Sequence, residues 1–167
     1  MHSYGRVETE MGQFWVACSS DGIAMISPAK QAPAVFEAIY RQYAGARPER
    51  RDISESYIHA VREAAAGRPF EAVPIDLSNL SKFQRKVLKA LQKIPAGEVR
   101  TYAWLARKAG QPNAARAVGN TMARNPVPIL IPCHRVVPAA GGIGNYGMGS
   151  AMKRDLLMRE GVPVDEL

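Results

Sequence analysis

The chain has 167 residues, a length that suits one ordinary domain or two small ones. Apolar residue types make up 47% and charged types 22%, so the composition is globular and excludes a disordered chain. The formal net charge of +7 is unevenly placed: residues 1–80 carry 8 basic and 10 acidic side chains (net −2), and residues 81–167 carry 14 and 5 (net +9). The second half should therefore attract phosphate backbones, nucleotides or anionic membranes.

Several protein classes are excluded by what the sequence lacks. The longest apolar run, residues 127–131, contains a proline and is far shorter than the ~20 residues of a membrane-spanning helix. We expect no secretory signal, because Glu8 and Glu10 follow soon after Arg6 and no basic patch precedes an apolar stretch. Cys18 and Cys133 could make one disulfide at most, which favours a reducing interior, and the Cys and His residues show no metal-binding spacing. We expect no membrane span, no metal and no cofactor.

The first half should open as antiparallel sheet. Two apolar runs, residues 13–19 and 23–27, are joined through Asp21-Gly22, which is a strong hairpin signal. Helical spacing of apolar residues then predicts helices over 35–43 and 57–65. Residues 72–77 have the pattern of a strand or an extended linker, and we place the domain boundary near Ser78, giving domains 1–78 and 79–167.

The second half should begin with a helix. Ser81 followed by Gln84 has the spacing of a capping box, in which each side chain satisfies a free backbone donor of the other residue. Pro95 and Gly97 end this helix, and its polar face is rich in lysine.

Two shorter helices follow, the first capped by Thr101 and running through residue 108, the second capped by Asn113 and running to about Arg124. Their spacing fits a helix-turn-helix, and it also fits an ordinary helical hairpin. A strand over 127–131, a glycine-rich loop and a last helix over 150–160 complete the chain.

A thiol lies beside an imidazole where the predicted strand ends, at Cys133 and His134. A free cysteine, with a pKa of about 8.5, is only slightly ionised at neutral pH, so a nucleophilic cysteine needs a base or a cation nearby. His134 and Arg135 are the candidates. Because adjacent side chains seldom face each other, a bridging water or a tight turn is more plausible than direct contact. The alternatives are a buried structural cysteine and a zinc ligand.

The predicted helix over residues 113–124 has an unusual face. Arg116 projects from a surface of small residues, which are Ala114, Ala115, Ala117 and Gly119. Such a surface can pack closely against a neighbouring element. On DNA, it would let the backbone approach a groove while one guanidinium reaches among the bases.

A series of short motifs runs without interruption from residue 83 to residue 161. They are Phe83-Gln84, Ile94-Pro95-x-Gly97-Glu98, Thr101-Tyr102, Ala115-Arg116-Ala117-Val118-Gly119, Asn125-Pro126, Pro132-Cys133-His134-Arg135-Val136 and Gly144-Asn145-Tyr146. In order and spacing, this half of the chain resembles the O6-alkylguanine-DNA alkyltransferases. The first half is similar to the family only in size and in its hairpin-then-helices outline.

The resemblance implies an α/β (α+β) fold, with an N-terminal ribonuclease H-like domain and a mostly helical C-terminal domain carrying a winged-helix-like helix-turn-helix. It implies DNA repair by irreversible, single-turnover transfer of the alkyl group of O6-alkylguanine, and of O4-alkylthymine, to Cys133 after base flipping. The expected partner is double-stranded DNA containing O6-alkylguanine, bound by a cytoplasmic monomer.

The resemblance also assigns roles at the reacting centre. Cys133 is the nucleophile, and a relay runs from Glu160 through His134 and a water to its sulfur. Asn125 ties the recognition helix to the active-site strand, and Tyr102 helps to rotate the target nucleotide and donates a hydrogen bond toward the guanine ring.

On the DNA side, Arg116 replaces the flipped base in the stack, and the DNA-binding set is Arg116, Tyr102, Ala115, Ala117, Gly119 and Arg124. The substrate pocket is formed by Val136, Tyr146, Gly147 and Met148. Because many members carry glycine in place of Met148, we expect a narrower pocket here that disfavours bulky alkyl groups.

Two rival functions fit some of the same residues. One is a helix-turn-helix DNA-binding or damage-sensing protein without chemistry, for which Cys133 would have no role. The other is a thiol hydrolase that uses Cys133 and His134 and turns over many times, for which the Arg116 helix would have no role.

Overall fold

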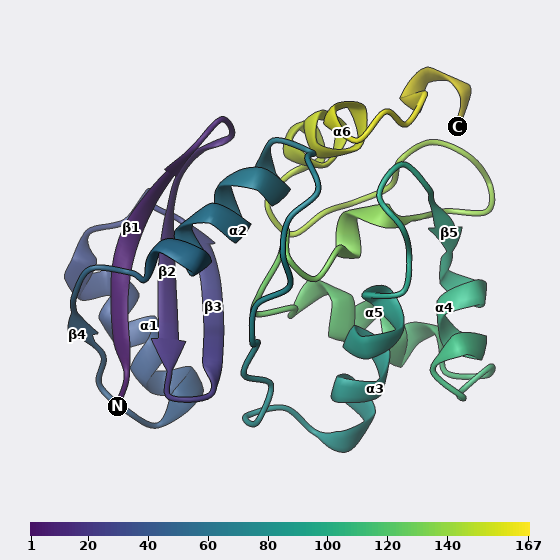
Figure 1. Cartoon of the computed structure of the whole chain (residues 1–167). Coiled ribbons are helices and arrows are strands. Elements are labelled where there is room, and N and C mark those ends of the chain that lie inside the picture. Colours follow the sequence, from purple (N-terminus) through teal and green to yellow (C-terminus); the bar gives the residue numbers. More distant parts are fainter. The chain divides into compact units, whose positions relative to one another are not determined.

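The computed structural model describes all 167 residues and divides into two compact units, Met1–Asn79 and Leu80–Leu167 (Figure 1). The first unit contains a four-stranded sheet and two α-helices. The second contains four α-helices and a two-stranded sheet. The chain is therefore a mixed α and β protein, as predicted.

The sheet of the first unit has the strand order β3-β2-β1-β4. Strands β2 (Gly12–Ser19) and β3 (Gly22–Pro28) form the predicted antiparallel hairpin. Strand β1 (Ser3–Thr9), which was not predicted individually, pairs antiparallel with β2, and the short β4 (Glu49–Arg50) pairs parallel with β1. A Cβ at Gly22 would lie 2.3 Å from the Pro74 carbonyl oxygen, so only glycine fits this turn.

Both helices predicted for the first unit are confirmed, as α1 (Pro33–Ala44) and α2 (Glu55–Ala65). They lie on opposite faces of the sheet (Figure 1). The α1 helix buries Phe36 and Tyr40 in a cluster with Trp15 of β2. Residues 72–77 form no strand and make one isolated parallel bridge, between Ile75 and Ile23.

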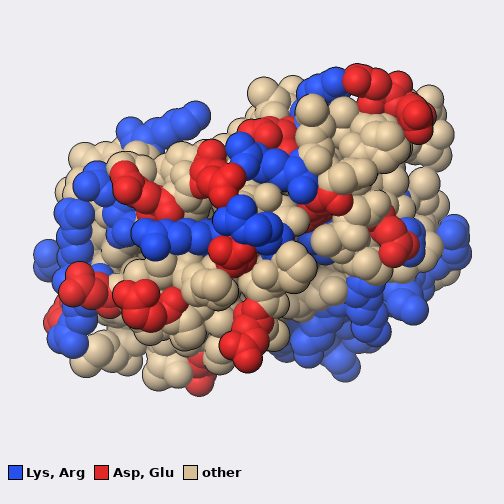
Figure 2. Space-filling model, turned by 45° about the horizontal axis from the view of Figure 1, so that its top comes forward, with Lys and Arg blue, Asp and Glu red and all other residues tan.

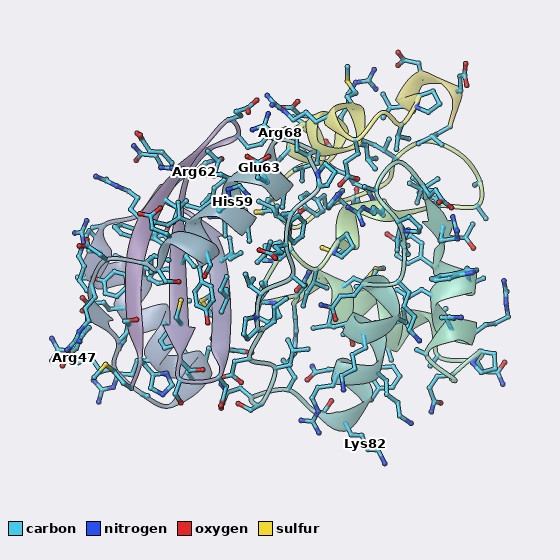
Figure 3. All side chains as sticks on the ribbon, viewed as in Figure 1. Arg47, His59, Arg62, Glu63, Arg68 and Lys82 are labelled. Atoms are coloured by element: carbon cyan, nitrogen blue, oxygen red, sulfur yellow. The ribbon has the colours of Figure 1, made fainter.

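The second unit begins with α3 (Lys82–Leu91), and the predicted capping box is confirmed. Ser81 Oγ accepts from Gln84 N at 3.1 Å, and Gln84 Oε1 accepts from Ser81 N at 2.9 Å. The apolar face of α3 is buried and its lysine face is exposed. Lys82 points outward at the start of this helix (Figure 3). Figure 2 shows basic side chains gathered at the lower right of the molecule.

The next helices are α4 (Tyr102–Lys108) and α5 (Ala115–Ala123). Thr101 caps α4 as predicted, accepting from Trp104 N at 3.2 Å. The predicted cap at Asn113 is wrong: Ala114 is the N-cap of α5 and makes no side-chain cap. The chain first turns, with Ala114 N donating to Gln111 O at 3.0 Å, and this turn delays the start of the helix.

The strand predicted over residues 127–131 is also wrong. Prolines at 126, 128 and 132 lack the N–H groups that a ladder needs, and the segment makes only one isolated bridge, between Pro128 and Ile131. Ile129 has φ = 78°, a conformation that a β-branched residue seldom adopts. The strand pairing in this unit is instead a short parallel one, between β5 (Arg100–Thr101) and β6 (Val136–Val137).

The predicted last helix is confirmed as α6 (Ser150–Arg159), which ends at Glu160 before Gly161. Leu157 of α6 packs with Val162 and Val164, the latter in the short 3-10 helix Val164–Glu166. No helix of the structure is both long enough and apolar enough to span a bilayer.

Candidate active site

A cavity of about 370 Å³ lies within the second unit. Its wall comes from the start of α4, the second half of α5, the Cys133 turn and the glycine-rich loop, and the lining residues are Tyr102, Gly119, Met122, Ala123, Cys133, Asn145, Tyr146 and Gly147. The structure thus brings together five residues assigned by resemblance, from four separate segments. Val136, which is buried, and Met148, which is half-buried, are not among these lining residues, so their assignment to the substrate pocket stays a prediction.

Cys133 begins a single turn of 3-10 helix, Cys133–Arg135, and is 8% exposed. Asn125, which directly follows the C-cap of α5, holds it in place. Asn125 Nδ2 donates to Cys133 Sγ at 3.3 Å and to Ile131 O at 3.0 Å, while Asn125 Oδ1 accepts from Val127 N at 3.0 Å. One amide therefore connects the end of α5, the proline-rich segment and the thiol.

The electrostatics of Cys133 combine opposing effects. Burial raises the pKa of its thiol, whereas the Asn125 hydrogen bond and the positive charge of Lys153 lower it. The sulfur therefore needs help from its neighbours to ionise.

His134 and Glu160 form a buried pair behind the thiol. His134 is 1% exposed, and its Nε2 lies 3.2 Å from Glu160 Oε1, within ion-pair distance but without the alignment of a hydrogen bond. Burial lowers the pKa of His134, and Glu160 opposes this only in part. The imidazole is therefore neutral at neutral pH and able to accept a proton.

The sequence makes Arg135 a candidate activator of the thiol, but in the structure its guanidinium is hydrogen-bonded to the Glu160 carboxylate. Its Nε and Nη2 donate to the two carboxylate oxygens at 3.0 and 2.6 Å, and its Nη1 donates to Ile94 O at 2.6 Å. Burial opposes ionisation of Glu160, yet His134 and Arg135 lower its pKa from 4.5 to about 2. The carboxylate is held ionised and in a fixed orientation.

Two phenols face the same cavity. Burial raises the pKa of both Tyr102 and Tyr146, and the charge of Cys133 adds to this in each case. The Tyr146 hydroxyl is buried without a hydrogen-bond partner, and its ring meets the His134 ring edge-on at 6.4 Å. Both hydroxyls stay protonated at neutral pH and can act as donors.

Much of the exposed surface of α5 consists of small residues. Ala115, Arg116 and Ala117 are exposed, and Arg124 is exposed at the C-cap. A Cβ at Gly119 would meet nothing within 4 Å, so packing inside this protein does not require glycine there. The open space beside Gly119 is available to an external molecule.

Lys153, which is 1% exposed on α6, is a residue of this region that sequence reasoning missed. Its Nζ donates to Val136 O at 2.7 Å and to Asn145 O at 3.2 Å. In the sequence it is followed by Arg154 and Asp155 and looks like a surface residue. The signal that could have revealed it is its spacing of three and four from Leu156 and Leu157, which places it on the buried face.

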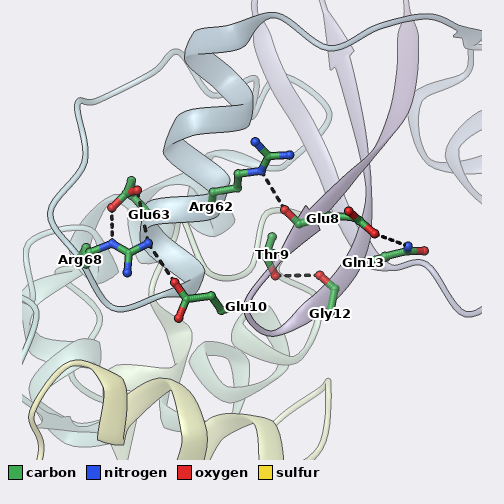
Figure 4. Close-up of a pocket in the computed structure, with 8 residues that line it drawn as sticks. All are labelled: Glu8, Thr9, Glu10, Gly12, Gln13, Arg62, Glu63 and Arg68. Atoms are coloured by element: carbon green, nitrogen blue, oxygen red, sulfur yellow. Dashed lines mark hydrogen bonds and ion pairs between the residues drawn. The ribbon is translucent and has the colours of Figure 1, made fainter.

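A larger cavity, of about 560 Å³, lies in the first unit (Figure 4). Its arginines already have partners: Arg68 pairs with Glu63 and Glu10, and Arg62 donates to the backbone carbonyl oxygen of Glu8 at 2.9 Å. The cavity contains no thiol or imidazole. The smaller cavity at Cys133 is therefore the candidate active site, although it has less volume.

Comparison with known proteins identifies the family of the chain. The profile described as "6-O-methylguanine DNA methyltransferase, DNA binding domain" matches residues 82–162. Methylated-DNA--protein-cysteine methyltransferase of Rattus norvegicus is 46% identical over 114 residues, covering 67% of this chain and 54% of the relative. The Homo sapiens protein of the same name is 49% identical over 107 residues, covering 64% and 51%. The alignments span about half the length of these curated relatives.

Solved structures match over nearly the whole chain. The O6-methylguanine methyltransferase of Mycobacterium tuberculosis is 30% identical with a TM-score of 0.78, covering 96% of this chain and 93% of that one. Mycobacterium tuberculosis OGT in complex with DNA is 31% identical with a TM-score of 0.77, covering 98% and 97%. The chain therefore belongs to the family of the methylated-DNA--protein-cysteine methyltransferases, or O6-alkylguanine-DNA alkyltransferases.

Proposed function

We propose that this protein repairs DNA by moving the alkyl group of O6-alkylguanine irreversibly onto Cys133. The observation that carries the proposal is the position of the Cys133 thiol, held by Asn125 in the wall of a cavity and backed by the buried His134–Glu160 pair. The family's curated and solved members, including one solved with DNA, support the same activity.

In the proposed reaction, neutral His134 accepts the Cys133 proton through a water, and ionised Glu160 stabilises the imidazolium that forms. The sulfur attacks the alkyl carbon, the carbon–O6 bond breaks, and its electron pair stays with the guanine. Tyr102 and Tyr146 donate hydrogen bonds toward the charge that develops on the base. The product is a thioether with no leaving group, so each molecule acts once.

On the DNA side, we propose that Arg116 fills the space left by a flipped base while Ala115, Ala117 and Gly119 let α5 approach the groove. The lysine face of α3 would add phosphate contacts. O4-alkylthymine has an equivalent alkyl-oxygen bond and is proposed as a second substrate.

The finer fold assignments are also proposals. Three antiparallel strands followed by a helix and a strand parallel to β1 support a ribonuclease H-like domain over residues 1–78. Helices α4 and α5 with the β5–β6 pair support a winged-helix-like domain over 79–167. We propose that the protein works as a monomer inside the cell, where DNA is accessible.

The stoichiometry of transfer tests the proposed function. Incubation with excess duplex carrying one O6-methylguanine should add the mass of one methylene group, located on Cys133, and then stop. The control Cys133→Ser should still bind the duplex and gain no mass. A protein that binds without any mass gain is the non-catalytic DNA-binding alternative, and demethylation beyond one base per protein would establish a turnover enzyme.

Replacing Arg116 tests base flipping. Arg116→Ala should slow repair of duplex DNA about tenfold or more, but should barely affect reaction with the free modified base, because only the duplex must be opened. Arg107→Ala, which removes another exposed cation, is the matched control for charge and should weaken binding without this selectivity. Equal slowing of Arg116→Ala on both substrates would assign Arg116 to folding or chemistry.

A further inference from the structure

The lysine face of α3 is a row of positive charges without acidic partners. Residues 77–97 contain no aspartate or glutamate. No carboxylate pairs with any basic side chain in this range, and the only side-chain hydrogen bond among them joins Arg85 to the Leu80 carbonyl oxygen at 2.6 Å. The lysine face, continued one turn beyond the helix, consists of Lys82, Arg85, Lys86, Lys89 and Lys93.

This face lies on one side of the helix, opposite the core. Its four members within α3 fall inside about 100° of arc, because each helical residue advances by about 100°. Leu91, in the buried face, lies opposite Lys82. The buried face is the one that packs against α4 and α5. The lysine face therefore points away from both helices, as Lys82 does in Figure 3, and so away from the helix that exposes Arg116.

Keeping these charges together works against the helix that carries them. Like charges repel when they lie four positions apart, as in the pairs Lys82–Lys86 and Arg85–Lys89. Lys82 also occupies the first position of α3, at the positive end of the helix dipole, and the first turn has no acidic residue. The capping box and the buried face hold the helix in spite of this repulsion. Uncompensated charge of one sign indicates a ligand of the opposite sign.

The residues of the lysine face favour nucleic acid as that ligand. A helix that binds a membrane surface needs an exposed apolar face, but the apolar face of α3 is buried in the second unit. Protein interfaces are normally anchored by aromatic or apolar side chains, but the exposed residues within α3 are all lysines. These lysines lie roughly 5 Å apart along the helix axis. That spacing is on the scale of DNA, where each strand carries one charge per about 3.4 Å.

We propose that the lysine face is a second DNA-binding site, which holds a duplex segment other than the one engaged by α5 and lets the protein pass directly between segments. The inference deepens the proposed function and rests on it, because it assigns the phosphate contacts of the lysine face to the second segment. Lysines contact phosphates without reading bases, so this site binds any sequence, damaged or not. A protein that acts once on a rare base then searches DNA without full release at each step.

The test measures how fast the protein leaves one duplex in the presence of another. A complex of one protein molecule with a short, undamaged fluorescent duplex is mixed with unlabelled duplex, and the loss of anisotropy is followed by stopped flow. For the natural protein, the apparent dissociation rate should rise in proportion to the concentration of competitor. Release before rebinding gives a rate that does not depend on the competitor, and that result would overturn the proposal.

A triple variant assigns this behaviour to the lysine face. The substitutions are Lys86→Gln, Lys89→Gln and Lys93→Gln, which remove repulsion and leave the buried face intact, so folding should be preserved. The dissociation rate of this variant should no longer depend on the competitor. Arginine at the same three positions keeps the charge and should restore the dependence.

The matched control removes the same number of exposed cations from the first unit. Its substitutions are Lys30→Gln, Arg41→Gln and Arg47→Gln. This control should keep the dependence on competitor seen with the natural protein. If both triple variants lose it, net charge explains direct transfer without a second site, and the proposal is overturned.

The salt dependence of binding distinguishes a second segment from a longer contact with the first. The measurement uses Cys133→Ser and a short duplex with one O6-methylguanine, which should occupy the cavity without reacting. Each phosphate contact contributes about 0.9 to the slope of log affinity against log salt. Adding the triple lysine-to-glutamine change should leave this slope as it is. A slope smaller by about 2.7 would mean that the three lysines contact the duplex held by α5, against the proposal.

The natural protein separates this inference from the proposed function. Methyl transfer to Cys133 is measured on damaged duplex without competitor, and direct transfer is measured on undamaged duplex. Direct transfer without methylation of Cys133 would refute the proposed function alone. Methylation of Cys133 with a dissociation rate independent of competitor would refute the second DNA-binding site alone.

Discussion

Glu160→Gln should destabilise the second unit by about 3 kcal/mol at neutral pH, because removing one partner of a buried ion pair leaves the other charge uncompensated. The Glu160 side chain is 4% exposed and that of Arg135 is 12% exposed, so water cannot replace the lost carboxylate. Methyl transfer should also slow, since the imidazolium of His134 would lose its neighbouring anion. Urea unfolding followed by far-UV circular dichroism measures the loss of stability.

The pH dependence of the same variant gives a second measurement. The pKa of Glu160 falls from 4.5 to about 2 on folding, so its contribution is complete above pH 4.5 and is lost as the pH falls toward 2. The stability difference between the natural protein and Glu160→Gln should shrink across that window. Glu166→Gln, at an exposed carboxylate, should change stability by less than about 0.5 kcal/mol. A difference that stays constant down to pH 2 would show that the charge of Glu160 is not the cause.

Asn125→Ala should cost about 1–3 kcal/mol, because it leaves the buried N–H of Val127 unpaired and removes one of the two hydrogen bonds to the Ile131 carbonyl. It also removes the donor to Cys133 Sγ, so the pKa of the thiol should rise and its reaction with iodoacetamide should slow. Asn125→Asp keeps the acceptor for Val127 N but places a negative charge beside the sulfur.

The two Asn125 variants should therefore rank differently in two measurements. At neutral pH, Asn125→Asp should have a higher free energy of unfolding than Asn125→Ala. The Cys133 thiol of Asn125→Asp should nevertheless react more slowly with iodoacetamide than that of Asn125→Ala. Asn120→Ala, at an exposed asparagine of α5, is the matched control and should change neither measurement. The same ranking of the Ala and Asp variants in both measurements would mean that Asn125 affects the thiol only through stability.

Local chemistry made much of the fold predictable. The Ser81–Gln84 capping box and the Asp21-Gly22 turn involve residues a few positions apart, so their contacts are encoded in short spacings. The nucleophile was identifiable for a similar reason, because Cys133 and His134 are adjacent in a motif.

Long-range contacts could not be predicted in this way. Glu160 is 25 positions from Arg135, and nothing local shows that the two meet. Lys153 was missed because a charged side chain on a helix is normally solvated, and only its tertiary environment buries it. The strand predicted over residues 127–131 is wrong for a different reason: the apolar residues favour a strand, but the prolines at 126, 128 and 132 lack the N–H groups that strand pairing needs.

The burial of Cys18 determines how this protein would respond to oxidants. Cys18 lies inside β2, and burial raises the pKa of its thiol to about 12, so it remains a thiol and stays inaccessible while the sheet is folded. A sulfenic acid formed on Cys133 by peroxide would therefore have no resolving cysteine within the chain, and only an external thiol such as glutathione could reverse it. Further oxidation to the sulfinic acid would consume the molecule without any base having been repaired.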